Sequence, residues 1–218
     1  MKERPILFTG AMVRAILNGS KTQTRRVLKS NCQEIGERDD GTLWPWSEHP
    51  DSAADYWHPC PHGQPGDRLW VRETFQGPLF EEEDSWLYHE DPTSFQKPSY
   101  CQYAADGGGP PEFMTPDDEL VCRWRRSIHM PRWASRILLE IVSVRVERLH
   151  AISEADARAE GITDGGCTNC GYPEPCGCVN PAPDARDAFC YLWGQINGPD
   201  AWAINPWCWC IEFKRVAK

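Results

Sequence analysis

The sequence predicts an α+β protein in which several strands are separated by about three short helices. Apolar residues alternate along Ile137–Leu149 and Trp207–Val216, as they do in half-buried strands. Apolar residues recur at helical spacing in Gly10–Asn18 and again after Pro183. The strands are too far apart for hairpins alone and too irregular for a doubly wound sheet. We therefore expect a small barrel or a strongly curved mixed sheet with long loop insertions.

The composition indicates a globular chain that stays inside the cell. It has 218 residues, of which 40% are hydrophobic and 11 are Trp, which suits one enlarged domain over 1–218. No apolar run approaches the ~18 residues of a membrane span. The N-terminal MKERPILF lacks the apolar core of a signal peptide. We expect a cytoplasmic protein with no membrane partner.

The charge is unevenly distributed along the chain. A net charge of −9 argues against coating of nucleic acid by bulk attraction. Residues 76–122 form an acidic insertion in which Lys97 is the only lysine or arginine, whereas bases gather in Arg14–Lys29 and Arg123–Arg136. Local basic surfaces suit recognition of a few phosphates, and solvated faces are the alternative interpretation.

The N-terminal elements follow from their end signals. Ile6–Phe8 is expected to be a short strand, and Thr9 can cap the helix Gly10–Asn18. Gly19 ends that helix, and the β-branched run Thr22–Val27 is expected to be a strand.

The middle of the chain is expected to hold long loops. Residues 30–64 are rich in Asp, Gly, Pro and His and are expected to be loop. Pro65–Gly66 predicts a type II turn that begins a strand, Arg68–Phe75. Within the acidic insertion, a short strand is expected near Tyr100–Ala104.

The C-terminal part combines two helices with a cysteine-rich loop. Ser153 can cap a helix that runs to Glu160 and stops at Gly161. Residues 165–182 form the cysteine-rich loop. Pro183 opens a helix that Asn197 closes.

Several sequence blocks together resemble a known family. They are Gly19–Arg26 (GSKTQTRR) after an amphipathic helix, Pro65–Phe75 (PGDRLWVRETF), Ser127–Arg136 (SIHMPRWASR) and the C-terminal NPWCWCIEF. These blocks resemble the ASCH-domain proteins of the PUA-like superfamily, whose larger members come in many cases from phages and prophages. The resemblance implies a small PUA-like (ASCH) β-barrel that handles a nucleoside, a nucleotide or RNA.

One branch of that family implies a catalytic group. The bacterial N4-acetylcytidine amidohydrolases are similar at Lys21, Thr22, Thr24 and Glu160. The resemblance implies that Thr24 is the nucleophile, Lys21 its base and Glu160 the third member. A threonine hydroxyl needs a neighbouring base, and a lysine serves as one when burial or nearby cations lower its pKa. Arg25 is close enough in sequence to contribute such a charge.

Strand geometry favours a more cautious interpretation of the same run. Alternation places Thr22, Thr24 and Arg26 on one face of a regular strand and Lys21 on the other. Lys21 meets Thr24 only if the turn before it redirects the chain. A non-catalytic module that binds RNA, DNA or a modified nucleotide is therefore the alternative function, and an endoribonuclease is a further one.

Other candidate binding residues combine aromatic rings with arginines, which suits a stacked base and its phosphate. Core packing is the alternative for Trp133, and Glu73 is expected either to pair with a buried base or to mark a bulge. The candidate nucleotide-binding residues are Arg25, Arg26, Trp70, Arg72, Arg132, Trp133 and Arg136.

The cysteines point to a metal rather than to disulfides. Their number is 11, and a cytoplasmic chain keeps thiols reduced. Four of them form a C-x₂-C-x₅-C-x-C cluster that predicts a structural zinc with four thiolates, with no organic cofactor expected. A reduced loop without metal is the alternative. The predicted zinc ligands are Cys167, Cys170, Cys176 and Cys178.

Overall fold

A computed structural model of the chain describes residues 1–29, 34–48, 55–114, 119–163, 177 and 185–216. The α-helices are α1 (Gly10–Leu17), α2 (Ser85–Glu90), α3 (Glu154–Ala159) and α4 (Ala185–Asn197). The strands are β1 (Glu3–Leu7), β2 (Gln23–Val27), β3 (Glu34–Glu37), β4 (Leu43–Glu48), β5 (Asp55–Trp57), β6 (Arg68–Arg72), β7 (Phe75–Gln76), β8 (Gln102–Tyr103), β9 (Glu112–Met114), β10 (Leu120–Cys122), β11 (Leu138–Arg148) and β12 (Trp207–Arg215). Short 3₁₀ helices cover Glu82–Asp84, Pro92–Phe95, Pro98–Tyr100, Ala104–Asp106, Ser127–His129, Arg132–Ala134 and Leu149–Ala151.

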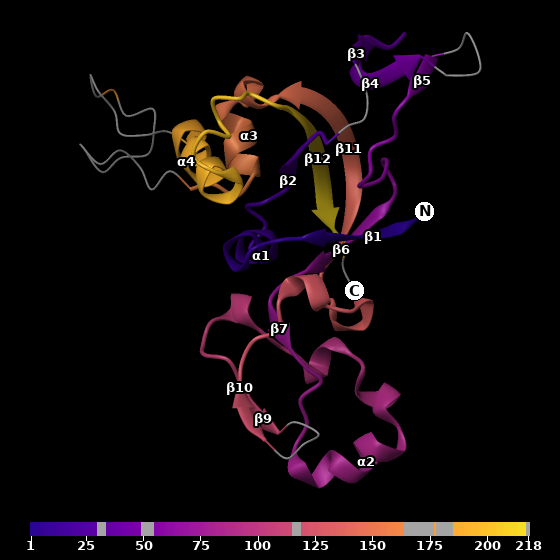
Figure 1. Ribbon diagram of the computed structural model, residues 1–218, viewed down its shortest axis with the longest axis vertical. Coiled ribbons are helices and arrows are strands. Elements are labelled where there is room, and N and C mark those ends of the chain that lie inside the picture. The colour runs from indigo at the N-terminus through magenta and orange to yellow at the C-terminus, as the bar shows by residue number, and fades with distance from the viewer. Residues whose placement is uncertain (30–33, 49–54, 115–118, 164–176, 178–184, 217–218) are drawn as a thin grey trace. The chain divides into compact units, whose positions relative to one another are not determined.

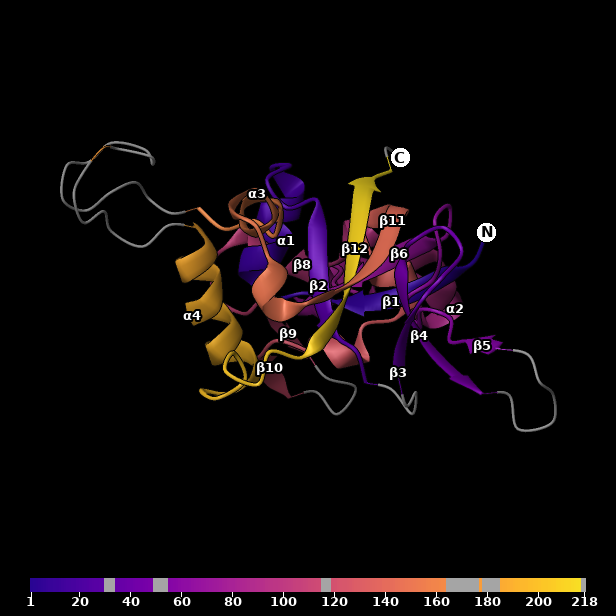
Figure 2. The same cartoon turned by 90° about the horizontal axis from the view of Figure 1, so that it is seen from above.

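The largest sheet is mixed, as the sequence predicts. Its five strands are hydrogen-bonded in the order β1-β6-β11-β12-β2. β1 and β6 are parallel, whereas β11 is antiparallel to β6 and β12 is antiparallel to β2. Figures 1 and 2 show β11, β12 and β2 side by side, with β11 bent along its length. The α+β class is confirmed, but no closed barrel is found in the described residues.

The chain divides into two compact units, and the expectation of one enlarged domain over 1–218 stays a prediction. The first unit consists of Met1–Leu17, Asp67–Glu140 and Arg215–Lys218, and the second of Asn18–Gly66 and Ile141–Lys214. The boundary falls inside β11. Each unit is therefore assembled from segments that lie far apart in the sequence.

In the second unit, α3 and α4 pack together over a buried cluster. Leu149, Phe189 and Trp193 are its largest members, and each is at most 5% exposed. Ser153 begins α3 with a capping box, because its Oγ accepts from the Asp156 amide while Asp156 accepts from the Ser153 amide. The expected helix start is confirmed, and α3 ends before Gly161, whose φ of +87° is the left-handed conformation typical of a residue after a helix.

In the first unit, β6 supplies alternate side chains to the core. Leu69 and Val71 are buried, as the alternation predicts. Glu73 is also buried, and the Arg136 guanidinium donates to its two oxygens at 2.9 and 3.0 Å. Of the two alternatives for Glu73, pairing with a base is correct. The expected strand ends early, because Phe75 belongs to β7, which pairs with β8 instead.

Residues 30–64 were expected to be loop, and this prediction is wrong for Glu34–Glu37, Leu43–Glu48 and Asp55–Trp57. β3, β4 and β5 form an antiparallel sheet there. Trp46 lies opposite Trp57 in the register, and Trp44 meets Trp209 of β12 edge to face at 5.0 Å. Cross-strand aromatic pairs stabilise these strands despite the Pro and Asp residues that suggested loop. Within the described residues, none of the helices has the length and apolar character needed to cross a membrane.

Candidate functional site

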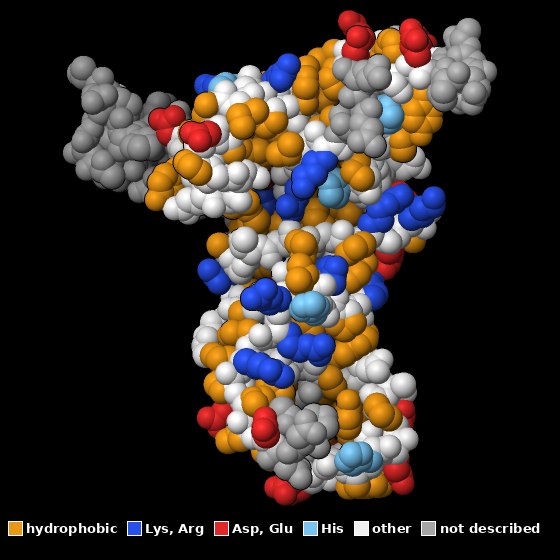
Figure 3. Space-filling model, viewed as in Figure 1, with side chains coloured by type: hydrophobic (Ala, Val, Ile, Leu, Met, Phe, Trp, Pro, Cys, Tyr) orange, Lys and Arg blue, Asp and Glu red, His pale blue; other side chains and the backbone are white. Residues whose placement is uncertain are grey.

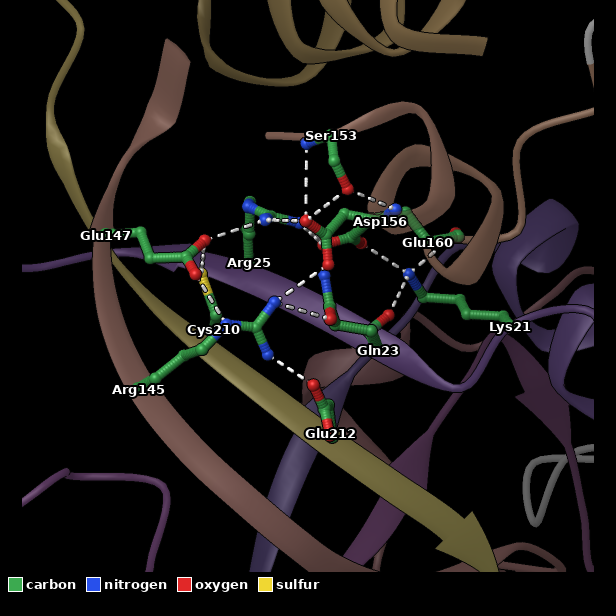
Figure 4. Close-up of polar contacts among 10 residues, drawn as sticks. All are labelled: Lys21, Gln23, Arg25, Arg145, Glu147, Ser153, Asp156, Glu160, Cys210 and Glu212. Atoms are coloured by element: carbon green, nitrogen blue, oxygen red, sulfur yellow. Dashed lines mark hydrogen bonds and ion pairs between the residues drawn. The ribbon is translucent and has the colours of Figure 1, made fainter. Parts of the chain in front are cut away.

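Lys21 is the most deeply buried charge in the predicted catalytic group. Its side chain is 0% exposed. Nζ donates to Glu160 Oε2 at 2.7 Å, to the Glu160 carbonyl oxygen at 2.8 Å and to the Gln23 carbonyl oxygen at 2.8 Å (Figure 4). Three acceptors match the three hydrogens of an ammonium group. The arrangement therefore suits the charged form of Lys21.

Two local features bring Lys21 to Glu160. Gly19 has a φ of +83°, which ends α1 in the left-handed conformation that glycine adopts most readily. The chain then forms an antiparallel bridge between Lys21 and Glu160, beside a hydrogen bond from the Thr22 amide to the Ala159 carbonyl oxygen. The end of α3 is thus fastened to the residues just before β2, and the resulting ion pair joins residues far apart in the sequence.

Burial and neighbouring charges act in opposite directions on Lys21. Burial lowers its pKa below the ordinary value of 10.5, because water no longer solvates the ammonium. The Glu160 carboxylate raises the pKa, while the guanidinium groups of Arg26 and Arg25 lower it further. The net direction is downward, which is the direction that a general base requires.

Arg25 connects Lys21 and Glu160 to a wider charge network. Its side chain is 0% exposed, with Nη2 at 3.0 Å from Glu147 Oε2 and 3.3 Å from Asp156 Oδ2. Nη1 lies 3.6 Å from Glu160 Oε1. That oxygen is buried and accepts no hydrogen bond within the described residues. Glu160 therefore keeps one oxygen with acceptor capacity.

Arg145 completes the network from β11. Its Nε donates to Glu147 Oε1 at 2.6 Å and its Nη2 to Asp156 Oδ1 at 2.8 Å, and Nη1 donates to Glu212. Gln23 Oε1 also accepts from Nη2 of Arg145 at 3.1 Å. These carboxylates hold two arginines in place, so the side chains around Lys21 form a preorganised cluster (Figure 4).

Sequence reasoning did not find the residues of this network beyond Arg25 and Glu160. One signal was present: Arg145 and Glu147 share a face of the long predicted strand, so opposite charges are placed side by side. Asp156 occupies the third helical position after the Ser153 cap. There its carboxylate accepts from the Ser153 amide and also forms ion pairs with Arg25 and Arg145.

Thr24 lies on β2 and is 2% exposed. Alternation places Thr24 with Arg26 on one side of the strand, and Gln23 with Arg25 on the other. Lys21 Nζ, however, contacts the carbonyl oxygen of the peptide bond that joins Gln23 to Thr24. Because Lys21 precedes β2, its Nζ can reach this peptide bond although Lys21 and Thr24 do not share a strand face.

A cavity of about 380 Å³ adjoins this cluster within the second unit. Thr22 and Gln23 line it, together with Asp156 and Glu212. The Gln23 side-chain nitrogen is buried without a hydrogen-bond partner among the described residues. A volume of this size suits a small molecule, for which pockets range over ~300–1,000 Å³. Lys21, Thr24 and Glu160 are not among the lining residues described.

The remaining candidate binding residues belong to the first unit. The guanidinium carbons of Arg72 and Arg132 lie 5.4 and 6.0 Å from the centre of the Trp70 ring. Arg132 also donates to Glu3 at 2.9 Å. Trp70 and these two arginines therefore form the aromatic and cationic group that the sequence predicts.

Trp133 and Arg136 occupy structural positions. Trp133 packs against the core cluster that contains Phe75 and Met130. Arg136 is bound by Glu73 and by Asp106, and its guanidinium carbon lies 3.9 Å from the Tyr103 ring centre. Arg136 already has two anionic partners, so a phosphate would have to compete with them.

The predicted zinc ligands Cys167, Cys170, Cys176 and Cys178 lie outside the described residues, and the zinc site stays a prediction. Two other cysteines are packed thiols, since Cys208 and Cys210 are both 0% exposed on β12. Burial raises the pKa of both thiols, to about 12 for Cys208.

Comparisons of the chain with models of protein families, with curated proteins and with solved structures found no match.

Proposed function

We propose that the second unit handles a nucleoside or nucleotide and hydrolyses the amide of an N4-acylated cytosine nucleoside. The contact of 2.7 Å between Lys21 Nζ and Glu160 Oε2 carries this proposal, because it joins two members of the expected group across the fold. The same ammonium lies beside the peptide that leads into Thr24. The resemblance of Gly19–Arg26 to the N4-acetylcytidine amidohydrolases supplies the substrate class.

The proposed reaction begins with Thr24. Its Oγ attacks the acyl carbonyl carbon while the hydroxyl proton passes to neutral Lys21. The carbon–nitrogen bond then breaks, the cytosine amine receives a proton, and the acyl group stays on Thr24 until water releases it as a carboxylic acid. Arg26 shares a strand side with Thr24, so its guanidinium is the candidate donor to the developing oxyanion.

Lys21 must lose a proton before it accepts one. Glu160 Oε2 is the acceptor in place, and the lowered pKa of Lys21 favours this transfer. The neutral amine keeps two hydrogens for the Glu160 and Gln23 carbonyl oxygens, while its lone pair faces the new Glu160 hydroxyl. Lys21 can accept a proton from Thr24 only after one of these contacts of Nζ breaks. Substrate binding must therefore move the Lys21 side chain.

The alternative function is binding without hydrolysis. All three hydrogens of Lys21 are donated within the protein, which suits a fixed positive charge better than a base. The cavity is also lined by Thr22 and Gln23 rather than by Thr24. These two observations favour a module that recognises a modified base.

Product analysis separates these functions. The chain and a Glu160→Gln variant are incubated with N4-acetylcytidine and, separately, with labelled RNA, and products are identified by mass spectrometry. We expect cytidine and acetate from the wild type and a rate lower by at least ~100-fold in the variant, the usual size of a lost acid–base group. If the wild type binds N4-acetylcytidine but leaves it intact, the protein is a binding module. If the labelled RNA is shortened, the protein is a nuclease. Either result contradicts hydrolysis of the amide.

A further inference from the structure

A second cavity lies in the first unit, remote in sequence from Gly19–Arg26. It has a volume of about 600 Å³ and is lined by Arg123–Arg126, with Gln76, Phe113 and His129. We name it the Arg123–His129 pocket. Its size falls within the ~300–1,000 Å³ of ordinary ligand pockets.

The lining of this pocket is strongly basic. Arg123, Arg125, Arg126 and His129 are exposed, and none of the described lining residues is acidic. The chain as a whole carries a net charge of −9, so this local excess of positive charge opposes the general balance. Figure 3 shows basic and histidine side chains gathered over the part of the first unit that holds β7 and β10. Such a surface attracts an anion.

The basic segment is fastened to the fold at Arg125. Its backbone exchanges hydrogen bonds with Phe75 of β7 at 2.8 and 3.2 Å. Its Nη1 donates to the Gly77 carbonyl oxygen at 3.3 Å, and its guanidinium carbon lies 5.4 Å from the Phe75 ring centre. Arg125 therefore positions the segment, and the exposed side chains of Arg123 and Arg126 are left to meet a ligand.

The pocket also contains groups that suit an aromatic base. Trp124 and Phe113 are half-buried in its wall, and a partly exposed ring offers a face for stacking. Gln76 is 5% exposed, and its Oε1 is buried without a hydrogen-bond partner among the described residues. A buried acceptor of this kind is normally satisfied, and an N–H group of a nucleobase would satisfy it.

We propose that the Arg123–His129 pocket binds a nucleotide unit, with the phosphate at Arg123 and Arg126 and the base against Trp124. The unit comes either from a free nucleotide or from a single-stranded nucleic acid. The proposal does not depend on hydrolysis in the second unit, because the two sites share no residue.

The test measures fluorescence anisotropy of a labelled single-stranded oligonucleotide against the full chain over a range of salt concentrations. The Arg123→Gln/Arg126→Gln variant is compared with Lys2→Gln/Arg186→Gln, which removes the same charge from exposed positions outside the pocket. We expect the pocket variant to bind at least ~10-fold more weakly than the control. Its slope of log K against log salt is expected to be smaller by about 0.7, since the two arginines are proposed to bind one phosphate and each single-strand phosphate contact contributes ~0.7.

Competition identifies the source of the nucleotide. Displacement by adenosine monophosphate indicates a free nucleotide, and displacement by unlabelled oligonucleotide alone indicates a single strand; both support the proposal. Ribose 5-phosphate lacks the base and should compete at least ~10-fold less well, as one lost stacking contact predicts. Equal affinity of the pocket and control variants would overturn the proposal. So would equal competition by ribose 5-phosphate, or no binding at protein concentrations on the order of 100 μM, the weak end of non-specific binding.

Both variants should still deacetylate N4-acetylcytidine if the proposed function is correct, since neither changes the second unit's cluster. Loss of oligonucleotide binding with deacetylation retained therefore reports on the pocket alone.

A Trp124→Leu variant with a native circular dichroism spectrum provides a second measure, and it is expected to lose the preference for adenosine monophosphate over ribose 5-phosphate.

Discussion

At the scale of single residues, the main feature is a lysine whose charge is both isolated from water and fully hydrogen-bonded. Burial lowers the pKa of Lys21, whereas Glu160 and two carbonyl oxygens hold the ammonium in place. Buried ion pairs of this kind are expensive to form and more expensive to break, because the partner that remains is left without compensation. The pair is therefore better explained by a role at a site than by a gain in stability.

This argument predicts the outcome of a double-mutant cycle. Glu160→Leu should lower the free energy of unfolding by about 3–5 kcal/mol, because it leaves the buried Lys21 charge unpaired. Lys21→Met/Glu160→Leu should recover much of that loss, since neither charge remains. Urea denaturation followed by circular dichroism measures the free energies of unfolding of the wild type, Lys21→Met, Glu160→Leu and the double variant. If the losses of the two single variants simply add in the double variant, Lys21 and Glu160 are not coupled as the contact implies.

At the scale of elements, the sequence predicted those features that depend on neighbouring residues alone, such as helix ends. The ends of α1 and α3 were predictable from Thr9, Gly19, Ser153 and Gly161, and the long strand from its alternation. The sheet of β3, β4 and β5 was not, because its stability depends on aromatic pairs such as Trp46 with Trp57 that only the folded register brings together.

The candidate site was predictable in part for the same reason. The pairing of Lys21 with Glu160 follows a resemblance, whereas Arg145 and its carboxylates are brought to Arg25 by β11 and α3. No local sequence pattern predicts these contacts, because they depend on the tertiary positions of β2, β11 and α3.

The start of α3 gives a prediction about acid stability. Burial tends to raise the pKa of Asp156, but hydrogen bonds from Ser153 and the charges of Arg25 and Arg145 bring it below the ordinary 3.8. The stability that Asp156 contributes is therefore present above pH 3.8 and is lost as the pH falls through the lower folded-state pKa.

Asp156→Asn should lower the free energy of unfolding by about 1–2 kcal/mol at neutral pH, the size of a lost charge-assisted hydrogen bond near a helix cap. The difference between variant and wild type should shrink as the pH falls through the folded-state pKa. Denaturation curves recorded at several pH values measure this difference, and a gap that stays constant down to pH ~2 would contradict the assignment.

At the scale of the whole molecule, the two candidate sites lie in different units. Lys21, Thr24 and Glu160 belong to the second unit, and the Arg123–His129 pocket belongs to the first. The net charge of −9 means that attraction to nucleic acid has to come from local basic groups. Each unit is assembled from separate segments of the chain, an arrangement that length and composition do not reveal.

The central claim is that Thr24 attacks the acyl group, and one measurement tests it most directly. Release of cytidine from N4-acetylcytidine is compared for Thr24→Val and Thr74→Val, which each remove a hydroxyl with little change in volume, the second at a position of the first unit. We predict that Thr24→Val lowers the rate by at least ~1,000-fold, as removal of a nucleophile does, and that Thr74→Val keeps a rate within ~10-fold of the wild type. Cytidine release by Thr24→Val at the wild-type rate would contradict the claim.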